Sequence, residues 1–217
     1  EASIVDTVLA LQPIQITDQH MQQLTALDEG LERVEELDLE KSQVTPAGLQ
    51  KLGKLQWLRS LNLSRIPVDD SILAQLQSMP GLEVLRLNHC PIGDEHLAQL
   101  APLGTLRELY LNETGITDAG FEHFRNLTNI EVLDVTSCQL DGDGFEVFDD
   151  MGEARSLREI QAHFTQFGKR GAKHVDGWDQ LEVLGVSRAA IDDKVMTRFR
   201  KLDNLRELDI SFNSVTD

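Results

Sequence analysis

The residues of this 217-residue chain that could do chemistry are few and scattered. Its two cysteines, Cys90 and Cys138, have no histidine at the spacing of a metal site or of a nucleophile with its base. The six histidines include no His-Glu-x-x-His arrangement, and no Ser-His-Asp set converges in any register. The residues therefore predict no catalytic residue, no metal site and no cofactor, and we expect that the chain is not an enzyme.

A short acidic stretch, Asp141-Gly-Asp-Gly144, resembles the start of a calcium-binding loop. An EF-hand loop needs further oxygen ligands and a glutamate at its twelfth position, where this chain has Gly152. The missing ligands favour the alternative, which is a helix N-cap followed by a turn.

A basic stretch stands where a helix is expected to begin after Phe167. It contains Lys169, Arg170, Lys173 and His174. A helix N-terminus with basic side chains can bind an anion, either a phosphate group or an acidic side chain, so these four residues form a candidate anion site. The alternative, which we favour, is local charge balance within an acidic chain.

The composition excludes several other classes of protein. The formal net charge of −17 argues against nucleic acid as a partner, because a phosphate backbone needs a basic face. No run approaches the ~20 apolar residues of a membrane-spanning helix, so we expect no membrane insertion. Aromatic residues make up only 5% of the chain, so aliphatic side chains should build most of the core.

An internal repeat determines the elements that position these residues. Clear copies begin at Val34, Leu58, Leu82, Leu106, Ile130, Leu157 and Leu181, with a partial copy over 205–217 and a weaker copy over 6–33. Successive clear copies are 24 residues apart, except for one step of 27. We number repeat positions from 0 at the first residue of each copy. Apolar residues at positions 3 and 5 alternate with polar ones, which predicts a strand.

The second half of each copy predicts a helix. Apolar residues at positions 15, 18 and 21 lie on one face of a helix. Position 11 is usually Thr or Asp, which are good N-cap residues, and position 12 is often Asp, which favours a helix N-terminus. In the copy from Val34, Pro46 suits the first helical position.

Two segments, Leu-Arg-Leu-Asn-His-Cys-Pro-Ile at 85–92 and Leu-Asp-Ile-Ser-Phe-Asn-Ser-Val at 208–215, carry the pattern L-x-L-x-x-N/C-x-L. This pattern resembles the leucine-rich repeat family, and the 24-residue spacing is most similar to its ribonuclease-inhibitor-like, cysteine-containing class in a bacterial form. The resemblance implies an α/β solenoid, a right-handed horseshoe with a concave parallel sheet and convex helices, spanning 1–217 as a single domain. Such folds bind many kinds of partner.

In this family, position 8 satisfies backbone groups in the turn after the strand. Both cysteines occupy it, two copies apart. Two strand spacings correspond to ~9.6 Å, which exceeds the ~7 Å that a disulfide tolerates between Cα atoms. We therefore predict two free, buried thiols.

The concave face is where the family usually binds, and positions 2, 4 and 6 should point toward it. The single tyrosine, Tyr110, is expected at the middle of this face beside Arg86, and both residue types are favoured at interfaces. The alternative is that Tyr110 is only a tolerated strand residue. The candidate protein-binding residues are Arg86, Asn88, His89, Tyr110, Asn112, Asp134, Gln161, His163, Phe164 and Arg188.

We therefore predict a protein-binding scaffold whose partner is an unidentified protein. One alternative is the recognition domain of a larger enzyme or effector, and another is an acidic inhibitor of a basic enzyme. The chain stops at Asp217, where a further helix should begin, so we expect more repeats or another chain to cover that end. Oligomeric state and compartment stay open, since a bacterial cytoplasm and export both fit.

Overall fold

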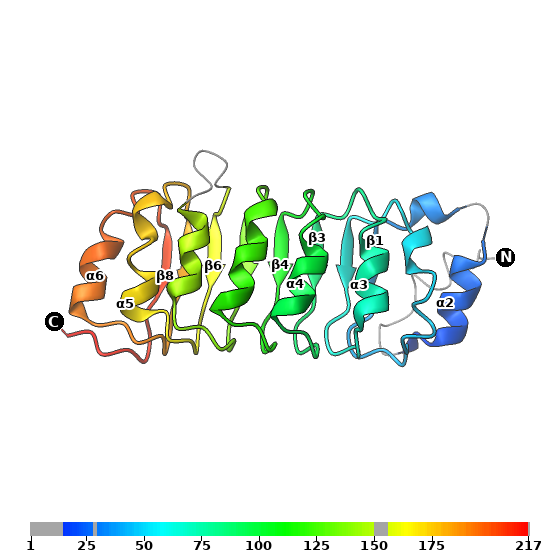
Figure 1. Cartoon of the computed structure of the whole chain (residues 1–217), viewed down its shortest axis with the longest axis horizontal. Helices are drawn as coiled ribbons and strands as arrows, with labels where there is room; N and C mark the ends of the chain where they lie inside the picture. Colours follow the sequence, from blue (N-terminus) through cyan, green and yellow to red (C-terminus); the bar gives the residue numbers. More distant parts are fainter. Residues whose placement is uncertain (1–14, 28–29, 150–155, 217) are drawn as a thin grey trace.

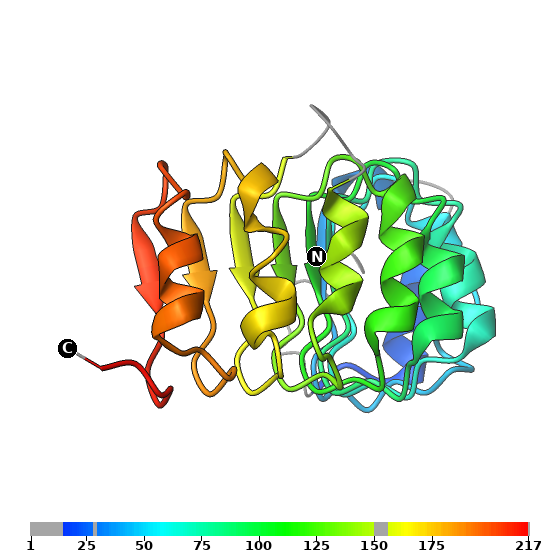
Figure 2. The ribbon, with the colours of Figure 1, turned by 60° about the vertical axis from the view of Figure 1, so that its left-hand side comes forward.

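The computed structural model of the chain describes residues 15–27, 30–149 and 156–216. They form an elongated stack of coils, with a sheet of eight parallel strands on one side and helices on the other (Figure 1). Figure 2 shows the same two layers after a rotation, with the last strand at the edge near the C-terminus. The expected α/β solenoid is confirmed.

The strands are three residues long and follow the order of the sequence. They are β1 (Glu36–Asp38), β2 (Ser60–Asn62), β3 (Val84–Arg86), β4 (Glu108–Tyr110), β5 (Val132–Asp134), β6 (Glu159–Gln161), β7 (Val183–Gly185) and β8 (Glu207–Asp209). Each residue pairs with the one 24 positions later, except between β5 and β6, where the step is 27. Residues 150–155, within the longer copy, lie outside the described residues, as do 6–14 and 28–29 of the weak first copy.

The helical segments differ in length and type. The α-helices are α2 (Asp18–Thr25), α3 (Asp70–Leu76), α4 (Asp94–Leu100), α5 (Gly168–Gly171) and α6 (Asp193–Phe199). The 3₁₀ segments are η2 (Leu31–Arg33), η3 (Leu52–Lys54), η4 (Asp118–Asn126), η5 (Asp143–Phe148) and η7 (Val175–Gly177). Among the described residues, no helix is long and apolar enough to cross a bilayer.

The prediction of a helix after Pro46 is wrong, because residues 46–51 form turns and only η3 follows. The difference correlates with glycine at position 14. Copies with glycine there (Gly48, Gly120, Gly144 and Gly171) form turns, 3₁₀ segments or the four-residue α5, whereas α3, α4 and α6 have another residue and seven helical residues each. Glycine lowers helix stability by ~1 kcal/mol relative to alanine, which explains the loss of regular helix.

These glycines make room for bonds between copies. The Asp94 carboxylate accepts hydrogen bonds from the backbone amide and the hydroxyl of Thr117 in the next copy, at 2.8 and 2.6 Å. A Cβ at Gly120 would lie 2.5 Å from this carboxylate. Asp18 binds Thr45 in the same way. The acids at position 12 therefore join neighbouring copies. Their type and position had predicted only that they favour helix N-termini.

The core lies between the sheet and the helices, and its strand residues are the leucines predicted from the alternation. Leu61, Leu85 and Leu109 are fully buried at the centres of β2, β3 and β4. Toward the C-terminus the helix side of the core turns aromatic. Phe121, Phe124, Phe145, Phe148, Phe167, Phe199 and Trp178 pack ring against ring, with centroids 4.9–6.4 Å apart.

This core is less covered at β8. Leu208 and Ile210, in and just after β8, are only partly buried, whereas the equivalent Leu184 and Val186, in and just after β7, are fully buried. The central residues of β2 to β7 are therefore covered by a neighbouring copy on each side, whereas β8 has a neighbouring copy on one side only among the described residues.

Candidate functional site

We call the side of the sheet turned away from the helices the open sheet face. Its central cluster consists of Arg86, Glu108 and Tyr110, on β3 and β4. The Arg86 guanidinium carbon lies 4.6 Å from the centroid of the Tyr110 ring, a cation–π contact. The Tyr110 hydroxyl donates to Glu108 Oε2 at 2.9 Å, and Arg86 Nη2 lies 3.6 Å from the same oxygen. The charge of Arg86 is therefore balanced within the cluster.

The surroundings of Tyr110 favour its neutral form. Partial burial, the hydrogen bond to Glu108 and the charge of that carboxylate raise the pKa of Tyr110 to about 12. The ring is held between Arg86 and the carboxylate, so it presents a fixed, half-buried surface rather than a mobile one.

Two other predicted residues bind the backbone with their side chains. Asn88 Oδ1 accepts a hydrogen bond from the amide of Asn112 at 2.9 Å. Asp134 accepts one from the amide of Thr136, also at 2.9 Å, which forms an Asx-turn. The Asn88 and Asp134 side chains therefore stabilise the strand ends. The side-chain oxygen of Asn112, by contrast, is buried without a hydrogen-bond partner among the described residues.

Gln161 and His163 lie across the strand that follows them. A Cβ at Gly185 would be 1.8 Å from Gln161 Oε1 and 2.4 Å from His163 Nε2, so the missing side chain at Gly185 provides their space. His163 Nδ1 accepts a hydrogen bond from the amide of Ser187 at 3.0 Å. In the neutral ring, Nε2 therefore carries the proton.

Position 7 of every clear copy, and of the partial copy over 205–217, has a left-handed backbone, with φ between 50° and 65°. We call these residues the rim: Lys41, Arg65, His89, Glu113, Ser137, Phe164, Arg188 and Phe212. The amides of Phe164 and Arg188 donate to the carbonyls of Ser187 and Ser211 in the next copy, at 2.9 and 3.0 Å. The rim thus extends the hydrogen-bond ladder beyond the strands. None of its residues is Gly or Asn, the types that mark such a conformation, so the sequence carried no signal for it.

At the C-terminal end of the rim, Phe164, Arg188 and Phe212 form what we call the rim cluster. The Arg188 guanidinium carbon lies 5.3 Å from the centroid of the Phe164 ring and 4.9 Å from that of Phe212. Phe164 is 55% exposed and Phe212 is 77% exposed. Phe212 was not among the predicted residues, although its position 7 in the repeat would have placed it beside Arg188.

The remaining predicted rim residue, His89, is already engaged. His89 Nδ1 lies 3.0 Å from Glu113 Oε2, and its Nε2 lies 2.7 Å from a guanidinium nitrogen of Arg65. The three side chains form a chain of contacts along the rim of adjacent copies.

The candidate anion site faces carboxylates of the preceding copy. Arg170 Nη1 lies 2.5 Å from Asp141 and 2.6 Å from Asp143, and His174 Nδ1 lies 2.5 Å from Asp149. Lys169 and Lys173 are exposed near them. This pairing supports charge balance between copies, and anion binding at these four residues stays a prediction.

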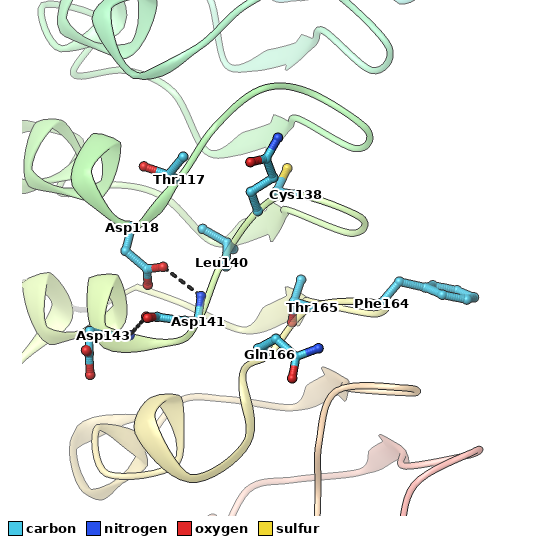
Figure 3. A pocket seen from close by; sticks show the side chains of 10 residues that line it. Thr117, Asp118, Cys138, Leu140, Asp141, Asp143, Phe164, Thr165 and Gln166 are labelled. Carbon is cyan, nitrogen blue, oxygen red and sulfur yellow. Dashed lines mark hydrogen bonds between the residues drawn. The ribbon is translucent and has the colours of Figure 1, made fainter.

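A groove of about 560 Å³ opens between the turns that follow β5 and β6. Carboxylates of Asp118, Asp141 and Asp143 line one end, and Phe164 projects away from the helices at the other (Figure 3). Between them lie the exposed Gln139 and Gln166 and the almost fully buried Cys138, Leu140 and Thr165. No group of three or more His, Cys, Asp or Glu side chains in the described part of the chain is arranged to hold a metal ion.

Both cysteines are free and buried, as predicted. The thiols of Cys90 and Cys138 donate to the carbonyls of Leu63 and Leu111, each at 3.2 Å. Burial raises the pKa of Cys90 to about 11 and also raises the pKa of Cys138, which makes both thiols poor nucleophiles.

Comparisons with known proteins agree with this geometry. A leucine-rich repeat model matches residues 80–97, 126–148 and 202–217, and no curated protein sequence matches the chain significantly. Among solved structures, internalin C2 (inlC2) of Listeria monocytogenes has a TM-score of 0.71 and 19% identity, over 99% of this chain and 90% of that one. The chain thus has a leucine-rich-repeat fold.

Two further solved structures with the same fold are of longer chains. An internalin (inlF) of Listeria monocytogenes has a TM-score of 0.63 and 21% identity, over 82% of this chain and 48% of that one. A chain from the octameric complex of Latrophilin 3, Unc5D and the leucine-rich repeats of FLRT2 has a TM-score of 0.63 and 22% identity, over 87% and 56%. This chain therefore spans about half the length of each of these two.

Proposed function

We propose that this chain is a protein-binding scaffold without catalysis of its own, which recognises its partner through the open sheet face. The observation that carries the proposal is the central cluster, in which Arg86 stacks on the single tyrosine near the middle of an eight-stranded sheet. A fixed aromatic ring and a guanidinium surrounded by polar side chains are the features of an interface anchor.

The packing of the strands supports this proposal. The central residues of β2 to β7, five leucines and Ile160, are buried, so the open sheet face is held rigidly from behind. A rigid surface loses little conformational entropy when a partner binds, which favours affinity. The FLRT2 repeats occur in a complex with other proteins, and the same use of the fold is what we propose for this chain.

The two cysteines support a narrower placement within the repeat family. We propose that the repeats belong to the ribonuclease-inhibitor-like, cysteine-containing class, because both thiols donate to carbonyls in the turn after a strand. By contrast, the inhibitor of a basic enzyme is a weaker alternative. Asp18, Asp94 and Asp118 are bonded to the next copy, so part of the negative charge serves the fold.

Carboxylate footprinting of a captured complex tests the proposed function. The partner is captured from the organism that produces the chain, and the free and bound chains are labelled with a carbodiimide. We expect protection of Asp134 and Glu159 on the open sheet face, whereas Glu95 and Glu122 on the helix side keep their labelling. Protection confined to the helix side would contradict the proposal.

A further inference from the structure

The eight phenylalanines divide into two groups with different surroundings. Six are packed in the aromatic core, and the other two, Phe164 and Phe212, are mostly exposed. An exposed phenylalanine is unfavourable because it leaves a large apolar surface in contact with water. These two lie on either side of one arginine, which makes them a single surface feature rather than two isolated exposed side chains.

That arginine differs from most others in the chain. Arg59, Arg107, Arg158, Arg170 and Arg206 each lie within ion-pair distance of a carboxylate in a neighbouring copy. Arg188 has no carboxylate partner among the described residues, although the chain carries 37 acidic residues. Both ring centroids lie within 5.3 Å of its guanidinium carbon, and its N–H donors are the part left to bind a carboxylate.

The backbone makes this arrangement rigid. The amides of Phe164 and Arg188 are hydrogen-bonded to the next copy, so the left-handed residues that carry the side chains are fixed. A guanidinium held between two rings is pre-organised, and the planar fork of N–H donors matches a carboxylate with two parallel hydrogen bonds.

The groove beside Phe164 indicates how a bound segment would be oriented on the rim cluster. Thr165 and the exposed Gln166 line the groove next to Phe164, and its far end carries Asp118 and Asp143 (Figure 3). Asp143 is bonded to Arg170, and Asp118 accepts backbone hydrogen bonds, so the far end is acidic but internally satisfied. A second carboxylate on the ligand would be repelled there.

We propose that the rim cluster and the adjacent groove bind an extended segment of a partner protein that carries one Asp or Glu followed by apolar residues. The carboxylate pairs with Arg188 between the two phenylalanine rings, and the apolar side chains cover the exposed rings of Phe164 and Phe212, with the segment passing along the mouth of the groove. This inference rests on the proposed protein-binding function and adds to it the chemistry of the partner.

Selection from a phage library of random dodecapeptides on the immobilised chain tests the inference. The enriched peptides should contain a single Asp or Glu next to apolar residues. A synthetic enriched peptide should bind Arg188→Gln about tenfold more weakly than the unchanged chain. Arg200→Gln is the matched control, since Arg200 is also exposed, lies just after α6 and has no carboxylate partner among the described residues.

A peptide in which Asp or Glu is replaced by Asn or Gln distinguishes the ion pair with Arg188 from the contacts with the two phenylalanine rings. It should bind the unchanged chain about tenfold more weakly and should lose no further affinity on Arg188→Gln. Thermal melts of both variants check that they are folded, which is expected for exposed side chains. Enriched peptides without an acid, or equal affinity for Arg188→Gln and the unchanged chain, would overturn the inference.

Two further outcomes distinguish this inference from the proposed function. If peptide binding depends on Arg86 and Tyr110 but not on Arg188, the open sheet face is the binding surface and the rim cluster is not. If the peptides bind only the helix side, both proposals fail. If the chain instead forms a dimer that Arg188→Gln disrupts, as measured by sedimentation, the rim cluster binds a second copy and the inference is overturned.

Discussion

The chain carries two arginine–aromatic clusters, and they differ in whether the arginine is charge-balanced. In the central cluster, Glu108 binds both Arg86 and Tyr110, and the side chains are half-buried. In the rim cluster, no carboxylate among the described residues reaches Arg188, and both rings are mostly exposed. An arginine beside aromatic rings thus forms a self-contained surface across the copies of β3 and β4 and an open one across the copies of β6 to β8.

The two clusters occupy different repeat positions. The central cluster occupies positions 2 and 4, whose side chains stand on adjacent strands and reach one another across the sheet. The rim cluster occupies position 7, where the backbone is left-handed. Position 7 alone does not isolate a side chain, since Lys41 and Arg65 lie within ion-pair distance of Glu40. The neighbours of Arg188 on the rim are phenylalanines, and among the described residues no carboxylate lies within ion-pair distance of it.

The largest expected effect is the difference in stability between truncating a buried phenylalanine and truncating an exposed one. Phe145 is fully buried and contacts Phe121 and Phe167 at centroid distances of 5.0 and 5.1 Å. Phe145→Ala should lower the free energy of unfolding by roughly 3–5 kcal/mol, because it leaves a cavity in the aromatic core. Phe212→Ala should lower it by less than about 1 kcal/mol. Denaturant melts measure both, and similar losses would show that the rim ring serves the fold.

The titration of Tyr110 tests whether the central cluster is self-contained. The folded chain should release the tyrosine proton at a pKa of about 12, rather than near the ordinary value of 10. Because the neutral form is favoured in the folded state, this contribution to stability is full below pH 10 and declines as the pH rises toward 12. The single tyrosine makes ultraviolet absorbance unambiguous.

Glu108→Gln is the variant that sharpens this titration. It removes the negative charge beside the hydroxyl, so the pKa of Tyr110 should fall toward its ordinary value while burial still holds it above. An unchanged pKa would show that Glu108 does not hold the ring in solution.

The cysteines give the smallest and most local comparison. Cys90 lies in the copy of Arg86, and Cys138 lines the groove beside the rim cluster. Both should react slowly with a thiol reagent at pH 8 and quickly after unfolding, with Cys138 the faster of the two in the folded chain because it lines an open groove. Fast reaction of both thiols in the folded chain would contradict their burial.

The sequence predicted the regular part of the molecule well. The 24-residue spacing, the buried leucines and the free thiols follow from alternation and from the strand spacing, which are local properties. The N-cap side chains of Asp69, Thr117 and Asp192 also accept the predicted hydrogen bonds. Each of these features is determined by the type of residue at a given repeat position.

The sequence could not predict features that depend on contacts between copies. The glycine at position 48 is visible in the sequence, but the space that it leaves for the Asp18 carboxylate is known only once the copies are stacked. The left-handed rim is likewise set by backbone pairing, since its eight residues include basic, acidic and aromatic types. The absence of a carboxylate near Arg188 among the described residues depends on distances in space. The sequence therefore predicted Arg188 as a binding residue but not that it lacks a carboxylate partner.

The most direct test of the proposed function is the affinity of a captured partner for a variant of the central cluster. The double variant Arg86→Ala, Tyr110→Ala should bind the partner about tenfold more weakly or worse, as measured by calorimetry. Glu122→Ala, on the helix side, should leave the affinity unchanged. Equal affinity of the partner for the double variant and the unchanged chain would contradict recognition through the open sheet face.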